Sequence, residues 1–237
     1  MRILLLADIH GNWPALEAIQ EPYDLCLCLG DLVDYALEPV ACIDWVRQHC
    51  KACVRGNHDH GAVHDVTEAG KNGYRFLSAV TRPITRKRLS ADALAYLAHL
   101  PLTQYLTADD TRLLLVHATP KNAIHSYGPP DTKFWENQLE GVDAEVICVG
   151  HSHESFILPV GDKLVINPGS VGFPRDGDPR ASYAIIENRR VEMKRIEYPV
   201  EKTVQIIQES ELPETAKLML AEALRSGGAK KETANWG

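Results

Sequence analysis

Short apolar runs separated by polar segments dominate the first 60 residues of the chain. Residues 2–7, 25–29 and 51–54 are such runs, and each has the length and composition of a buried strand. The segments 13–20 and 39–49 between them are predicted to be helical, the second with Val40, Ile43 and Val46 on one face. Alternation of strand and helix in this way indicates βαβ layering.

The pattern changes after residue 60. Residues 61–103 break the alternation and are expected to form a small, mostly helical insertion with a helix at Ala91–His99. Further strands are expected at 102–106, 112–116, 145–149, 156–160, 163–166, 183–187 and 191–197, and amphipathic helices at 200–208 and 213–225. We expect the antiparallel strands after residue 155 to form a second sheet packed on the first.

Five of the apolar runs end in side chains that bind metals or transfer protons. They are followed by Asp8 and His10, by Asp31 and Asp34, by Asn57 and His58, by His117, and by His151 and His153. Ligands of open α/β sheets bind beyond the carboxyl ends of the strands, so we expect these side chains to gather there. If Asp31 is shared, the seven residues other than His58 and Asp34 complete two four-ligand shells, which is the requirement of a binuclear hydrolytic site.

In this order the motifs resemble those of the calcineurin-like metallophosphoesterases. Asp8-x-His10, Gly30-Asp31-x-x-Asp34, Gly56-Asn57-His58-Asp59, His117 and Gly150-His151-x-His153 match over about residues 1–190, and the small prokaryotic branch shares Asn167-Pro168-Gly169-Ser170 and Pro174-Arg175. The resemblance implies an α/β fold, a four-layer α/β/β/α sandwich of two mixed sheets. We expect a metallophosphoesterase domain over 1–200 with a helical cap at 61–103, and C-terminal helices and a flexible tail over 201–237.

The resemblance also implies roles for single residues. One metal ion would be held by Asp8, His10, Asp31 and His153, and the other by Asp31, Asn57, His117 and His151. Carboxylate, amide and imidazole ligands suit Mn or Fe, with Ni or Zn able to substitute. His58 is expected to be the general acid and Asp34 to orient it. Asn12, a helix N-cap in the sequence pattern, and Arg175 are expected to contact substrate.

The expected reaction is hydrolysis of phosphodiester, nucleotide pyrophosphate or phosphomonoester bonds by in-line attack of a hydroxide that bridges the metals. Two alternatives stay open: a catalytically silent binding or scaffold protein, and a phosphoprotein phosphatase. The phosphoprotein-phosphatase branch carries Arg-Gly after the second aspartate, where this chain has Tyr35-Ala36. A degenerate scaffold is expected to lose His58 or a ligand first, and all are present. A phosphorylated small molecule or nucleotide is therefore the expected substrate.

Charge and hydropathy exclude some classes of partner. The formal net charge of −7 argues against binding to duplex nucleic acid or an anionic membrane. The sequence has no 18-residue apolar run. Its N-terminal apolar segment is too short for a signal peptide and reaches an acidic residue, Asp8, too early, so a cytoplasmic protein is expected. Assembly into a homo-oligomer is left open.

Three further features have competing interpretations. The six cysteines are expected to be reduced core thiols, Cys50 and Cys53 included, rather than half of a zinc site or a redox pair. The basic stretch 82–88 is either a solvated helix face or a set of cations that steers phosphate. His125 and Tyr127 are interpreted as ordinary loop residues, with substrate contact as the alternative.

Overall fold

The computed structural model describes residues 1–66, 70 and 72–228, so the tail predicted to be flexible, 229–237, lies outside the described residues. Within them the strands are β1 (Arg2–Leu6), β2 (Leu25–Cys28), β3 (Ala52–Cys53), β4 (Thr103–Ala108), β5 (Thr111–Val116), β6 (Val146–Cys148), β7 (Ser155–Val160), β8 (Lys163–Pro168), β9 (Ala181–Glu187) and β10 (Arg190–Ile196). The helices are α1 (Trp13–Glu17), α2 (Pro39–His49), α3 (Asn57–His64), α4 (Gly73–Arg88), α5 (Ala91–His99), α6 (Thr132–Gln138), α7 (Val200–Gln208) and α8 (Glu214–Ser226).

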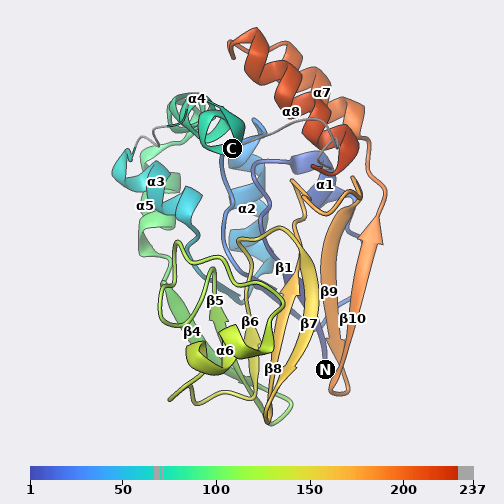
Figure 1. Cartoon of the computed structure of the whole chain (residues 1–237). Helices are drawn as coiled ribbons and strands as arrows, with labels where there is room; N and C mark the ends of the chain where they lie inside the picture. Colours follow the sequence, from blue (N-terminus) through green and yellow to red (C-terminus); the bar gives the residue numbers. More distant parts are fainter. Residues whose placement is uncertain (67–69, 71, 229–237) are drawn as a thin grey trace.

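Two mixed five-stranded sheets form the centre of the protein (Figure 1). The first has the order β10-β9-β1-β2-β3, with β1, β2 and β3 parallel and β9 antiparallel to β1. The second has the order β4-β5-β6-β8-β7, with β5, β6 and β8 parallel and the two edge strands antiparallel. The parallel strands of each sheet place their carboxyl ends at a common edge of that sheet.

The alternation of side chains along β1 shows how the layers are held together. Ile3 and Leu5 join the core between the two sheets, whereas Leu4 and Leu6 join a core between the first sheet and the helices α1, α2 and α5. Since successive residues of a strand point to opposite faces, a strand that is apolar on both faces must be covered on both. Helix α6 covers the outer face of the second sheet (Figure 1). Its Trp135 is fully buried. The four-layer α/β/β/α prediction is confirmed.

Another hydrophobic core lies outside these layers. It joins α4 to α7 and α8 and includes Tyr35 and Phe173 from the loops beyond the strand ends. Helix α8 ends at Gly227, which has φ +65° and whose carbonyl oxygen accepts a hydrogen bond from Gly177 N. The C-terminal helices are thereby packed against the loops that surround the strand ends.

Two details differ from the sequence-based expectations. The last two strands, β9 and β10, belong to the first sheet, not to the second; β9 is buried along nearly its whole length, as a strand between β1 and β10 must be. In α2, Val40 is 40% exposed, and Cys42 takes the buried position beside Ile43 and Val46.

The cysteines are free thiols, as expected, and all except Cys50 are buried. Cys50 is half-buried, with its Sγ 3.2 Å from that of Cys26. Among the helices that the structure describes, none combines the length and hydrophobicity needed to cross a membrane.

Asn12 connects four parts of the fold. Its Nδ2 donates to the carbonyl oxygen of Gly172 (2.8 Å) and to the hydroxyl of Tyr198 (3.1 Å). Its Oδ1 accepts from Ala15 N, which caps α1, and from the hydroxyl of Thr203 in α7. An amide side chain makes four hydrogen bonds at most, so Asn12 has no group left for a substrate in this conformation.

We therefore expect Asn12→Ala to lower the free energy of unfolding by about 2–4 kcal/mol, because it leaves buried partners without hydrogen bonds. Urea denaturation followed by circular dichroism measures the change. Asn137→Ala, on the exposed face of α6, is the matched control and is expected to stay within about 0.5 kcal/mol of the unchanged protein. A small effect of Asn12→Ala on stability combined with a raised KM would restore the substrate-binding role.

Candidate metal centre

Two clusters of buried acidic and histidine side chains lie beyond the strand ends and share Asp31. The first is formed by Asp8, His10, Asp31 and His153, and the second by Asp31, His117 and His151. Within each cluster the potential ligand atoms lie within 4.8 Å of one another. They come from the loops after β1, β2, β5 and β6, which are far apart along the chain. The half-buried Asn57, at the start of α3, faces the second cluster.

The backbone at these positions is unusual. Asp8, His10, Asp31, His151 and His153 all have φ between +51° and +68°. This left-handed conformation is uncommon for residues other than glycine and costs roughly 1–2 kcal/mol per residue. It turns each side chain sharply out of its strand and toward the common centre. Strain of this kind persists only where the surrounding structure enforces it and is typical of functional sites.

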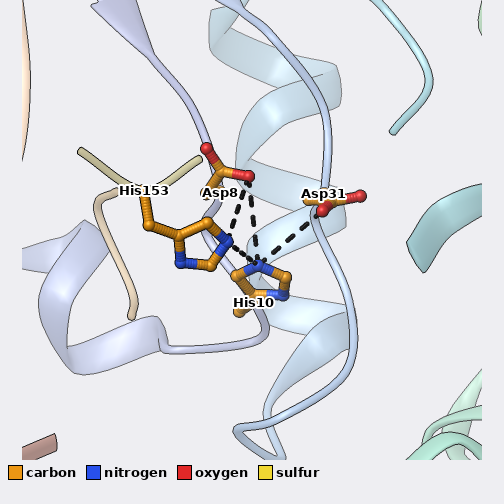
Figure 2. Close-up of side chains that lie close together, drawn as sticks. All are labelled: Asp8, His10, Asp31 and His153. Atoms are coloured by element: carbon orange, nitrogen blue, oxygen red, sulfur yellow. Dashed lines mark hydrogen bonds and ion pairs between the residues drawn. The ribbon is translucent and has the colours of Figure 1, made fainter. Parts of the chain in front are cut away.

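The first cluster brings together groups that would repel one another (Figure 2). The Nδ1 atoms of His10 and His153 face the carbonyl oxygens of Val33 and Phe173, at 2.9 and 2.5 Å, and must carry the hydrogens. Burial holds the pKa of both histidines well below the ordinary value. Their Nε2 atoms are therefore bare lone pairs, yet they lie only 3.1 Å apart.

Carboxylates complete this cluster. Asp8 Oδ1 is 3.5 Å from His153 Nε2, and Asp31 Oδ2 is 3.8 Å from His10 Nε2. Burial raises the pKa of Asp8 to about 7, because a buried carboxylate with no cation beside it is unfavourable. Converging lone pairs and carboxylate oxygens suit a positive ion, so these residues fit a bound metal.

The second cluster has the same character. His117 Nδ1 faces the carbonyl oxygen of Leu29 at 2.8 Å, which directs Nε2 toward Asp31 Oδ2 (3.2 Å) and Asn57 Oδ1 (3.1 Å). Burial by itself lowers the pKa of His117, but the Asp31 carboxylate outweighs it and raises the pKa to about 10. Asp31 Oδ2 and His151 Nε2 are both buried without a hydrogen-bond partner. The cluster thus requires either a proton on His117 or a metal cation.

A chain of three side chains lies beside Asp31. His58 Nδ1 is 2.8 Å from Asp34 Oδ2, and the same oxygen accepts from Arg82 Nε (3.0 Å) and Nη2 (2.5 Å). His58 Nε2 points toward Asp31 Oδ2, at 4.0 Å. Burial opposes a charge on His58, but Asp31 and Asp34 outweigh it and raise the pKa above the ordinary value. Asp34 therefore holds His58 with one nitrogen directed at the shared carboxylate.

Arg175 reaches the edge of the site. Its Nη2 donates to the hydroxyl of Tyr35 (3.1 Å), its guanidinium lies over the ring of Tyr74 (4.0 Å), and its Nε is buried without a partner. Its backbone N donates to the carbonyl oxygen of His153, which fixes it beside the first cluster.

The chain is similar to known phosphoesterases along most of its length. Residues 1–190 match the calcineurin-like phosphoesterase superfamily domain. The chain belongs to the calcineurin-like phosphoesterase superfamily. The resemblance inferred from the motifs is thereby confirmed, and the two buried clusters of this phosphoesterase are consistent with a binuclear metal site.

Individual relatives cover nearly the whole chain. An uncharacterized protein of Methanocaldococcus jannaschii, MJ0912, is 32% identical over 235 residues, 90% of this chain and 94% of its own. The phosphodiesterase YfcE of Escherichia coli is 26% identical over 198 residues, 79% of this chain and 88% of its own. A metallophosphoesterase structure from Sphaerobacter thermophilus superimposes with a TM-score of 0.78 at 31% identity, over 96% of this chain and 99% of that one.

Several residues that build the site of this phosphoesterase were given no role in the sequence-based prediction. Asp59 accepts hydrogen bonds from the backbone N atoms of Asp31, Leu32 and Gly56 and so fixes the Asp31 loop. Asn167 Nδ2 donates to the carbonyl oxygen of Gly150, and the Ser170 hydroxyl donates to that of Asp8. Asp59, Asn167 and Ser170 all belong to the motifs quoted above, so their place in those motifs was the signal that could have identified them.

Arg82 was missed because the basic stretch 82–88 was read as solvated or steering. The structure buries Arg82 at 4% exposure. Gly61 of α3 makes room for it: a Cβ there would lie 2.1 Å from Arg82 Nη1. Arg86 and Arg88 donate to the carbonyl oxygens of Ala62 and Leu37, so the cationic residues of α4 largely hold the insertion in place.

We expect Arg82→Ala to lower the free energy of unfolding by about 3–5 kcal/mol, because it removes one partner of a buried ion pair and leaves the Asp34 carboxylate buried without its cation. The matched control is Lys87→Ala on the same helix, where the pair with Glu211 is exposed and contributes at most about 1 kcal/mol. Urea denaturation of both variants measures the difference. Equal losses would show that the Arg82–Asp34 contact is energetically unimportant.

Proposed function

We propose that this protein is a binuclear metal-dependent hydrolase of phosphodiester, nucleotide pyrophosphate or phosphomonoester bonds. The observation that carries the proposal is the pair of buried aspartate and histidine clusters that share Asp31 and have His58 beside them. The Escherichia coli relative is a phosphodiesterase by name, which supports the diester within this range.

In the proposed assignment each cluster holds one divalent cation. Asp8, His10, Asp31 and His153 bind the first, and Asp31, Asn57, His117 and His151 bind the second. Mn or Fe are the proposed ions, with Ni or Zn as substitutes, because the donors are imidazole nitrogens and carboxylate or amide oxygens. When bound, such a pair supplies Lewis acidity toward the phosphate and activates water at neutral pH for in-line attack.

His58 is the proposed proton donor to the leaving oxygen. Its Nδ1 is occupied by Asp34, so the hydrogen available to a substrate is on Nε2, on the side of Asp31. Asp34 acts as a positioning residue and is itself fixed by two hydrogen bonds from Arg82. The helical insertion at 61–103 would thus contribute to orienting the acid.

Arg175 is the proposed binding residue for a non-bridging phosphate oxygen, since a guanidinium matches phosphate geometry. Tyr35 stands where the phosphoprotein-phosphatase branch has arginine, and its hydroxyl accepts a hydrogen bond from Arg175. In this chain the guanidinium beside Tyr35 therefore comes from Arg175, in a different segment of the chain. This difference favours small phosphorylated substrates over phosphoproteins.

The proposal is tested by His58→Ala with two phosphodiesters, one with a 4-nitrophenolate and one with an alkoxide leaving group. Removing a general acid is expected to lower turnover roughly 10²–10⁴-fold for the alkoxide, which leaves only when protonated. The loss is expected to be much smaller for 4-nitrophenolate, which leaves without help. Steady-state kinetics with Mn²⁺ measures both.

Metal content, determined by elemental analysis, separates this role from metal binding. His58→Ala is expected to keep its metal, and Asp34→Asn is expected to show a milder form of the same pattern. His125→Ala, an exposed histidine in the loop 118–131, is the matched control with unchanged activity. Equal losses with both leaving groups, or loss of metal from His58→Ala, would contradict the assignment.

A further inference from the structure

An aromatic side chain projects into solvent beside the second cluster. Tyr127 is 61% exposed, yet its ring stacks on the ring of His151, with centroids 4.2 Å apart and planes inclined by 27°. It lies in the loop between β5 and α6, the same loop that begins with His117. One face of the ring is therefore fixed against the site, and the other is open.

The other strongly exposed tyrosine of the described residues has a different environment. Tyr105 is 46% exposed, and the guanidinium of Arg112 lies over its ring at 5.3 Å. A cation thus covers the face of Tyr105. Tyr127 has its partner on the side of the metal centre, where His151 holds it in a fixed orientation, and it offers a rigid aromatic surface at the mouth of the site.

Arg175 is close to this surface. Its backbone N donates to the carbonyl oxygen of His153, two residues after the histidine on which Tyr127 stacks. Tyr35 and Tyr74 contact the guanidinium directly, whereas its Nε is buried and unpartnered. A donor for a phosphate oxygen and an exposed aromatic ring therefore both contact the short segment 151–153, which contributes one histidine to each cluster.

We propose that Tyr127 and Arg175 form a subsite for phosphate esters that carry a flat aromatic group, such as the base of a nucleotide. The aromatic group stacks on the open face of Tyr127 while Arg175 binds a phosphate oxygen. This inference rests on the proposed phosphate-binding function and adds to it the chemical class of the substituent. Stacking of a base on an aromatic side chain is sequence-tolerant, so it selects for an aromatic group without selecting one base.

The test compares two ligands that a phosphoesterase cannot hydrolyse, benzylphosphonate and methylphosphonate. Isothermal titration calorimetry on the Mn²⁺-loaded full chain gives both dissociation constants. We expect benzylphosphonate to bind roughly 5- to 100-fold more tightly, the range that aromatic stacking provides. Tyr127→Ala is expected to abolish this preference and leave methylphosphonate binding unchanged, whereas Tyr127→Phe keeps the preference. Tyr105→Ala, which removes the other exposed tyrosine, is the matched control with unchanged binding.

Each other outcome overturns the inference in a distinguishable way. If both phosphonates bind the unchanged protein equally, the aromatic subsite is wrong and the phosphate site stands. If Tyr127→Ala loses metal and weakens both ligands alike, Tyr127 only shields His151 from water. If neither phosphonate binds the Mn²⁺-loaded protein, the proposed phosphate-binding function fails and the subsite fails with it.

Discussion

Asp31 is the residue on which the structure depends, because the two clusters of buried aspartate and histidine side chains meet at its carboxylate. One oxygen accepts from the backbone N of His58, and the other is buried without a hydrogen-bond partner, 3.2 Å from His117 Nε2. Like partial charges brought together in a buried site repel one another unless a cation lies among them. The left-handed backbone at five ligand positions, Asp31 among them, indicates that the fold enforces this arrangement at a cost in stability.

The layered architecture provides that enforcement. Strands β1 and β2 are apolar on both faces because they lie between a helical layer and a second sheet, so their ends are rigid platforms for Asp8 and Asp31. The second sheet brings His117 and His151 to the same edge from the opposite side. The helical insertion then adds Arg82 from α4, whose contact with Asp34 links the orientation of His58 to the packing of a separate segment. Most of the chain outside the central sheets contributes to holding a few side chains still.

The sequence predicts much of this site because strands and metal-binding motifs are local signals. The runs before Asp8, Asp31 and His117 are short and apolar, and their positions in the structure agree with the pattern to within about one residue. What depends on distant contacts was not predictable. The placement of β9 in the first sheet follows from its pairing with β1. The burial of Arg82 requires the space left by Gly61 and the carboxylate of Asp34, neither of which a charge pattern reveals.

The central claim is that Asp31 is shared by two metal ions. Anomalous scattering from crystals loaded with Mn²⁺, recorded on either side of the manganese absorption edge, tests it most directly. Two anomalous peaks are expected roughly 3.5–4 Å apart, the spacing typical of two-metal sites, with the Asp31 carboxylate between them. Both peaks are expected to disappear from crystals of Asp31→Ala. A single peak in the unchanged protein, or two peaks that persist in the variant, would contradict the claim.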